Sequence, residues 1–240
     1  MARPFRPILS ASVVVLSSLI GTHSANAGCG SSPGPGTDWS GCRKMSKVLQ
    51  EYDLTGAKFV RADLSRSNFQ KAKLIGADLT KTNLSYTILR RANLEKANLS
   101  GAFGTRTFMS EARLKGADLS KAEFFRAKMT AVDLSGANLN GSQLSRADLT
   151  AANLDAADAR NVNLSRAKLG LASLNQTNLE NAYLYRTDLR GVDLSKTIGL
   201  SQVQLRGSCG DKDTRLPQDL QTPGEWPCKL GQDKQAGKPK

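Results

Sequence analysis

The sequence predicts an all-β solenoid, in which the chain coils repeatedly and each coil stacks on the one before it. A bulky apolar residue recurs every five positions from Leu54 to Leu194, at 27 of 29 consecutive sites, and 22 of these sites are Leu. Two positions before these sites, 18 of the 29 residues are Ala. None of the eight prolines falls between 54 and 194, and both tryptophans, Trp39 and Trp226, lie outside it. The repetitive region is therefore continuous and sharply bounded.

A period of five fits neither an α-helix, which needs apolar residues three and four apart, nor a flat strand, which needs every second residue. If the central hydrophobe is called i, positions i and i−2 point to the same side of an extended segment. A bend must then follow, so that the next pair also points inward. Glycines such as Gly56 and Gly76, at i+2, suit this bend. Stacked coils bury Leu over Leu and Ala over Ala.

The repeated unit resembles the A-(D/N)-L-x-x motif of pentapeptide-repeat proteins. Examples are Ala77-Asp78-Leu79-Thr80, Ala92-Asn93-Leu94-Glu95 and Ala147-Asp148-Leu149-Thr150. The resemblance covers about 145 of 240 residues. It implies a right-handed quadrilateral parallel β-helix with 20 residues in each coil, hence about seven coils and a rod about 34 Å long at about 4.8 Å per coil. One of the implied core stacks is Leu79, Leu99, Leu119, Leu139 and Leu179.

The first 27 residues have the features of a secretory signal peptide. Arg3 and Arg6 give a positive start, residues 8–20 are mostly apolar, and 25–27 is a small-residue cleavage site. The apolar run is too short to span a bilayer, and the rest of the chain contains no longer one. We therefore expect a soluble protein exported to the periplasm or the extracellular space. Lipidation at Cys29 is the alternative.

The segments that flank the repeats are expected to cap the end coils, whose backbone edges are otherwise exposed. The chain then divides into a signal peptide (1–27), an N-terminal cap with a Gly/Pro-rich start (28–50), the β-helix (51–197), a C-terminal cap (198–228) and a basic tail (229–240). All four cysteines lie in the caps, at Cys29, Cys42, Cys209 and Cys228. An even number in an exported chain predicts disulfides. One bond within each cap is expected, because the rod separates the ends; a zinc site is the alternative.

Two core sites depart from the bulky pattern. Gly104 stacks between Leu84 and Phe124, and we expect the phenyl ring to fill the missing volume. Ala159 has no such filler, and a hole there would cost about 1–3 kcal/mol relative to Leu.

The chemistry available to the exported chain is limited. The only histidine, His23, lies in the signal peptide, so nucleophile systems that need histidine and the usual zinc centres are excluded. No phosphate-binding or dinucleotide fingerprint occurs. We expect no enzyme activity, no metal and no cofactor. The alternative is a carbohydrate- or peptidoglycan-acting enzyme that uses carboxylates alone.

A 20-residue coil also predicts which surface residues stack in columns. On the face of Leu79, the i−1 positions alternate strictly between Asp and Asn from Asp78 to Asn178. Like charges directly opposite are unfavourable, and each Asn both separates the carboxylates and offers an amide to bridge them. Stability alone explains this column.

The next face carries six of the eight arginines that occupy i+2 in the repeats. We call them the arginine column: Arg66, Arg106, Arg126, Arg146, Arg166 and Arg186. Lys128 and Lys168 lie across the corner. The aromatic residues of this neighbourhood are Tyr86, Phe103, Phe108, Phe125, Tyr183 and Tyr185.

Two interpretations of the arginine column remain open. In the first, a 20-residue unit was duplicated, the side chains extend into water, and local pairs such as Arg146–Asp148 and Arg186–Asp188 contribute little. In the second, the column binds an extended polyanion, because guanidinium groups bind phosphate or carboxylate bidentately and stack on aromatic rings.

The charge of the exported chain favours an anionic partner. It is +11, which is the +13 of the whole chain less Arg3 and Arg6. Some pentapeptide-repeat proteins are acidic rods that resemble DNA and protect topoisomerases; basic charge and export both argue against that role here, and export argues against nucleic acid as partner. We expect a non-enzymatic scaffold whose partner is an anionic envelope polymer or lipopolysaccharide. A further alternative is a structural rod that associates with itself through a cap, as a homodimer, or through its aromatic side.

Overall fold

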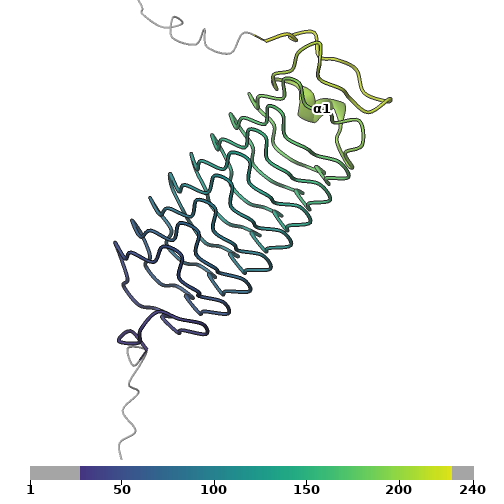
Figure 1. Ribbon diagram of the computed structural model, residues 1–240. Helices are drawn as coiled ribbons and strands as arrows, with labels where there is room; N and C mark the ends of the chain where they lie inside the picture. The colour runs from purple at the N-terminus through teal and green to yellow at the C-terminus, as the bar shows by residue number, and fades with distance from the viewer. Residues whose placement is uncertain (1–27, 229–240) are drawn as a thin grey trace, which may run out of the picture.

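The computed structural model describes residues 28–228, which form a right-handed quadrilateral β-helix whose coils stack along one axis (Figure 1). The two ends of the described chain lie at opposite ends of the stack. The predicted signal peptide, 1–27, and the basic tail, 229–240, lie outside the described residues. No helix in 28–228 is long and apolar enough to cross a membrane.

Each pentad contributes its i−1 residue to an isolated parallel β-bridge with the residue 20 positions further on. The column that starts at Asp38 and ends at Ile198 contains nine such residues, so eight full turns separate them. This ladder adds one coil to the seven expected from Leu54 onward. The bridges of Asp38, Arg43 and Val48 show that 38–50, part of the predicted N-terminal cap, already forms a coil.

The corner between pentads is a β-turn. Its hydrogen bond runs from the N–H of residue i+3 to the carbonyl of residue i, as from Ala57 to Leu54 at 3.0 Å. Residue i+2 has a positive φ, 65° at Gly56 and 56° at Arg126, as in a type II turn. An Asp or Asn at i−1 supports the turn, because its Oδ1 accepts the N–H of residue i+1; Asp118 does so from Ser120 at 2.9 Å. Turn formation thus explains the acidic or amide position of the motif.

The core runs along the axis of the rod and consists of the i and i−2 side chains. Where i−2 is threonine, its buried hydroxyl donates to a carbonyl one coil away, as from Thr177 Oγ1 to the Leu154 oxygen at 2.7 Å. A Cβ at Gly104 would lie 2.6 Å from Cε1 of Phe124, which confirms that the phenyl ring fills this space. Ala159 is fully buried.

The N-terminal end of the core is closed by Trp39, which occupies an i site and is 2% exposed. Its ring centroid lies 5.8 Å from that of Phe59, and its Nε1 donates to the Ser31 carbonyl at 3.1 Å. The predicted disulfide between Cys29 and Cys42 is present. Because this bond uses the thiol of Cys29, it is incompatible with a lipid on the same sulfur.

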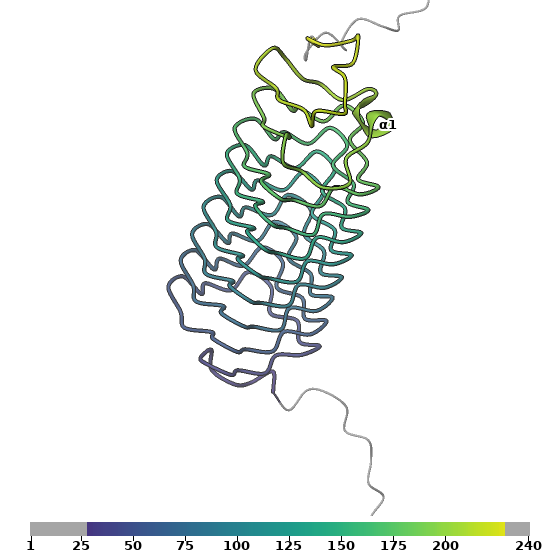
Figure 2. The same cartoon turned by 90° about the vertical axis from the view of Figure 1, so that its right-hand side faces the viewer.

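The C-terminal end is closed by the one helix of 28–228, α1 (Gln202–Leu205), which lies on the last coil (Figure 2). Gln204 Nε2 donates to the Leu179 and Ala182 carbonyls, at 2.7 and 3.0 Å, and so satisfies backbone acceptors at the open edge. Beyond α1, Cys209 and Arg215 extend the ladder by bridging to residues 188 and 193.

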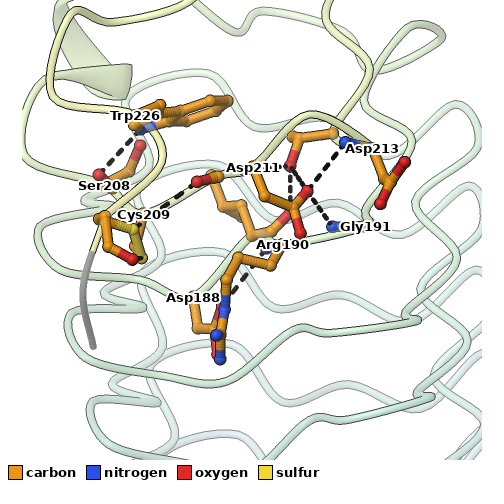
Figure 3. Close-up of polar contacts among 12 residues, drawn as sticks. Asp188, Arg190, Gly191, Ser208, Cys209, Asp211, Asp213 and Trp226 are labelled. Atoms are coloured by element: carbon orange, nitrogen blue, oxygen red, sulfur yellow. Dashed lines mark hydrogen bonds and ion pairs between the residues drawn. A yellow bond between two sulfur atoms is a disulfide. The ribbon is translucent and has the colours of Figure 1, made fainter. Parts of the chain in front are cut away.

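A disulfide and an indole hold the segment after α1 in place. Cys209 is bonded to Cys228, as predicted. Trp226 is buried and donates its Nε1 hydrogen bond to the Ser208 carbonyl at 3.0 Å (Figure 3). Beside it, Asp211 accepts the N–H of Gly191 at 3.0 Å, which ties the cap to the last coil.

Candidate functional site

The arginine column lies at one corner of the β-helix, where each side chain leaves a left-handed turn residue. The φ angles of the six arginines lie between 55° and 59°. Five of them are exposed, and Arg186, near the C-terminal cap, is partly buried. The five from Arg106 to Arg186 occupy consecutive coils. The structure therefore places the predicted residues one above another along a single edge.

On another corner of the rod, two basic residues alternate with glycine. There Lys81 and Lys121 also occupy i+2, with φ of 56° and 57°. The coil after each of them carries glycine, and the Cγ atom of Lys81 lies 3.4 Å from the position a Cβ of Gly101 would take. The equivalent distance between Lys121 and Gly141 is 3.8 Å. These lysines lean over a glycine, whereas the arginine column offers no such gap.

Some basic side chains elsewhere on the coils are neutralised by acids one coil away, whereas others, such as Arg61, Lys81 and Lys121, form no ion pair within residues 28–228. Lys71 Nζ lies 2.9 Å from Glu51 Oε1, and Arg91 Nε lies 2.8 Å from Glu111 Oε2. The hydrogen bonds from Arg91 hold the pKa of Glu111 below its usual value. Within residues 28–228, no ion pair is formed by Arg66, Arg106, Arg126, Arg146 or Arg166.

The prediction of an ion pair between Arg146 and Asp148 is wrong. Asp148 accepts instead from the N–H and the hydroxyl of Thr150, at 3.2 and 2.7 Å, because an i−1 carboxylate supports its own turn. Asp188, expected to pair with Arg186, is bound by Arg190 through Nε and Nη2, both at 2.8 Å (Figure 3). Local ion pairing therefore does not account for Arg146.

Aromatic rings contact part of the arginine column. The guanidinium carbons of Arg126 and Arg146 lie 5.1 and 5.6 Å from the ring centroid of Phe125. Arg186 lies 5.6 Å from the ring of Tyr185. Across the corner, Lys128 Nζ lies 5.6 Å from the ring of Phe108. These are cation–π distances, so rings and cations of this neighbourhood form one surface.

Lys168 takes less part in this surface. It is exposed and belongs to the ladder through bridges to Asp148 and Asp188, but its ammonium group makes no ion pair or ring contact within 28–228. The sequence therefore placed Lys168 in the right neighbourhood without identifying a contact for it.

A shallow pocket of about 350 Å³ opens on the face beside the column. We call it the aromatic trough; it is lined by Phe125, Ser145, Arg146, Ser165, Arg166, Tyr183 and Tyr185. The rings of Tyr183 and Tyr185 stack at 6.2 Å with 19° between their planes. The trough was not predicted from the sequence. The pattern that could have predicted it is the i+1 column, which contains Phe, Ser, Ser and Tyr at residues 125, 145, 165 and 185.

The Asp/Asn column behaves partly as expected. The amide of Asn138 donates to Asp118 Oδ1 at 3.1 Å, which confirms bridging at that step. Asp158 is instead bound by Arg160, at 2.8 and 2.7 Å, and these hydrogen bonds lower the pKa of Asp158. The carboxylates of Asp78, Asp118 and Asp158 thus accept hydrogen bonds from their own neighbours, and Asp158 also forms an ion pair.

The acids of the described residues bear on two kinds of site, a metal centre and a carboxylate-pair active site in one of three pockets. Groups of three or more His, Cys, Asp or Glu suited to a metal are absent from 28–228. A pocket of about 390 Å³ near Leu171 contains one carboxylate, Asp193. The aromatic trough and a third pocket, near Arg61, contain none.

Comparisons with known proteins agree with the geometry. The family model described as Pentapeptide repeats matches eight copies, at residues 49–85, 87–124, 127–166 and 163–198. The search of curated proteins found no match.

Among solved structures, the chain is similar to HetL, a pentapeptide repeat protein involved in heterocyst differentiation regulation from the cyanobacterium Nostoc sp. strain PCC 7120. The identity is 29% over 75% of this chain and 85% of HetL, with a TM-score of 0.33. A pentapeptide repeat protein from the Arabidopsis thaliana thylakoid lumen is 28% identical, over 43% of this chain and 69% of that chain, with a TM-score of 0.31. QnrB1, a plasmid-mediated fluoroquinolone resistance protein, is 18% identical, over 72% of this chain and 91% of that chain, with a TM-score of 0.40.

The family model covers more than half of the chain, and it does so over the region that forms the 20-residue parallel ladder. This chain belongs to the pentapeptide-repeat family.

Proposed function

We propose that the protein is a non-enzymatic exported scaffold that binds an extended polyanion of the cell envelope through the arginine column. The observation that carries the proposal is the run of arginines on consecutive coils, of which Arg106, Arg126, Arg146 and Arg166 form no ion pair within 28–228. Stacked like charges oppose folding. At i+2 on the other corners of the repeats, no more than two basic residues occupy consecutive coils, as Arg61 and Lys81 do. An external anion supplies the missing counter-charge.

The shape of the column suits an extended ligand. Consecutive coils are about 4.8 Å apart, so the five arginines from Arg106 to Arg186 follow one line for about 19 Å. Phe125 restrains two of the guanidinium groups, which lowers the conformational entropy lost on binding. A polymer with regularly spaced phosphates or carboxylates, such as lipopolysaccharide or an acidic polysaccharide, matches this line.

Export is supported by features at both ends of the chain. The sequence of 1–27 has the charge, apolar core and cleavage site of a signal peptide. The bonds Cys29–Cys42 and Cys209–Cys228 are of the kind that persists in oxidising compartments. The exported chain, with a charge of +11 (+13 less Arg3 and Arg6), would meet anionic envelope polymers there.

The enzyme alternative finds less support. Glycoside cleavage by carboxylates needs two acids across one concave site. None of the three pockets described above contains two. Residues 28–240 also contain no histidine.

The test is binding of residues 28–240 to immobilised lipopolysaccharide across a salt series. The variant is the triple change Arg126→Gln, Arg146→Gln and Arg166→Gln. The matched control removes the same charge from the same turn position on another corner, by substituting Gln for Arg61, Lys81 and Lys121. Equal circular dichroism spectra establish that all three proteins are folded.

We expect wild type to bind with a steep salt dependence, because binding releases counter-ions. The column variant should lose about tenfold or more in affinity and part of the salt slope, and the control should keep most of both. If both triple variants weaken binding equally, net charge is responsible and the column is not a site.

A further inference from the structure

The aromatic trough is bounded along the rod by two rings of one column. Phe125 and Tyr185 occupy i+1 three coils apart, which is about 14 Å at the coil spacing. The coils between them carry serine, at Ser145 and Ser165. Small residues between two large ones hollow the face. The resulting depression is about two coils long and has an aromatic ring at each end.

The serine hydroxyls of the trough are unpaired, whereas some i+1 hydroxyls on other faces bond to each other across coils. On another face, the hydroxyls of Ser100 and Ser120 lie 3.1 Å apart and bond to each other across coils. A third face shows the same pairing between Thr130 and Ser110 at 2.8 Å. The hydroxyls of Ser145 and Ser165 have no partner within residues 28–228. They are therefore free to bind a ligand.

The charge of the trough is positive and uncompensated. Arg146 and Arg166 line it, no carboxylate does, and neither arginine makes an ion pair within the described residues. Arg146 is oriented by the ring of Phe125 at 5.6 Å. The trough thus combines apolar ring faces, free hydroxyls and guanidinium groups.

These three kinds of group match a sugar acid. The C–H face of a pyranose packs on an aromatic ring, its hydroxyls exchange hydrogen bonds with serine, and its carboxylate accepts two bonds from a guanidinium. The coil spacing of about 4.8 Å is close to the length of one sugar residue with its glycosidic oxygen. A chain with one carboxylate per ring would then meet one arginine per coil.

We propose that the aromatic trough is a subsite for about four consecutive residues of an acidic polysaccharide that lies along the rod axis. Phe125 and Tyr185 pack on the two outer sugar rings, Ser145 and Ser165 bind hydroxyls of the two inner sugars, and Arg146 and Arg166 bind their carboxylates. This assignment rests on the polyanion-binding function proposed above and specifies the ligand class. The trough distinguishes a sugar acid from a polymer of phosphate alone, which has no apolar face.

The experiment is calorimetric titration of residues 28–240 with three probes: a hexamer of galacturonic acid, inorganic polyphosphate of equal charge, and a hexamer of thymidylate. The double variant Phe125→Ser and Tyr185→Ser extends the serines already present in the same column. The matched control is Phe103→Asn, at an exposed ring outside the trough, in a column that carries Asn in other coils. The exchange Phe125→Tyr with Tyr185→Phe keeps both ring faces and should retain binding. Circular dichroism verifies the fold of each variant.

We expect the double serine variant to lose about tenfold in affinity for the uronate and to change its affinity for polyphosphate less than about twofold. If the serine variant binds uronate as wild type does, or loses both probes equally, the subsite is wrong while the column function stands. If the thymidylate depends on the rings more than the uronate does, a sugar acid is the wrong ligand class. If wild type binds none of the probes, the proposed function itself fails.

Discussion

Neutralising the middle of the arginine column should stabilise the fold at low salt and destabilise it at high salt. The column from Arg106 to Arg186 contains four neighbouring pairs. Substituting Gln for Arg126, Arg146 and Arg166 removes all four. With guanidinium groups splayed to about 7 Å, each pair repels by about 0.6 kcal/mol in water, hence about 2 kcal/mol in total at very low ionic strength.

The same substitutions also remove attractive contacts. Arg126 and Arg146 both lie over the ring of Phe125, and exposed cation–π contacts contribute about 0.5 kcal/mol each. Salt screens the repulsion, with a Debye length of about 10 Å at 0.1 M and about 3 Å at 1 M, and leaves the ring contacts largely intact. The net effect is therefore a gain of about 1 kcal/mol near 10 mM salt, roughly none near 0.1 M, and a loss of about 1 kcal/mol at 1 M.

Urea unfolding at the three salt concentrations, followed by circular dichroism, measures this difference. For a chain of this length, 1 kcal/mol corresponds to about 2–4 °C in thermal midpoint, which is a second readout. The control triple of Arg61, Lys81 and Lys121 removes one neighbouring pair, since glycines separate Lys121 from other charges, and should gain about 0.5 kcal/mol at most. A column variant that is less stable than wild type at 10 mM salt, or whose difference is independent of salt, would refute the repulsion argument.

Three further predictions concern the core, the surface acids and the C-terminal cap. Gly104→Leu should destabilise by about 1–3 kcal/mol, because its Cβ would clash with the buried hydroxyl of Thr107 and with the ring of Phe124. Adding Phe124→Leu relieves the second clash and should recover part of the loss; additive effects in urea unfolding would contradict this. Hydrogen bonds from Arg160 lower the pKa of Asp158 in the fold, so its contribution to stability is complete above its unfolded pKa of about 3.9 and is lost as pH falls through the lower folded pKa. Thermal unfolding should show a smaller acid-induced decline for Asp158→Asn than for wild type. Substituting serine for both cysteines of the C-terminal disulfide should lower the free energy of unfolding by about 3 kcal/mol. Amides of the C-terminal cap should then exchange with solvent faster while those of the middle coils stay protected. Equal loss of protection in all coils would contradict a local capping role.

The regular part of the fold could be predicted because one rule acts at every pentad. The five-residue period specifies which side chains enter the core, and the stack from Leu79 to Leu179 is buried as expected. The first coil was not predicted because Lys44 occupies an i site, where the pattern requires an apolar residue. Its ammonium group lies 4.4 Å from the centroid of the Trp39 ring. One such exception hides a pentad from a pattern that relies on hydrophobic residues.

The candidate site was only half predictable. The arginine column follows from 20-residue spacing, because side chains at i+2 share one corner and one direction. The trough does not follow from charge at all. It arises where small side chains separate large ones at i+1, and it becomes visible only when Phe125 and Tyr185, three coils apart, are aligned in one column. The prediction of an Arg146–Asp148 ion pair failed for a physical reason. The two residues are close in sequence, but the Asp148 carboxylate already accepts a hydrogen bond from the N–H of Thr150 in its own turn.

The most direct test of the polyanion site is to locate the ligand on the protein. Residues 28–240 would be treated with an arginine-modifying dicarbonyl, with and without lipopolysaccharide, and the modified sites mapped by mass spectrometry. If the column is the binding site, the ligand protects Arg126, Arg146 and Arg166 and leaves Arg61, at another corner, as reactive as before. Equal protection of Arg61 and the column, or no protection of the column while the ligand is bound, would contradict it.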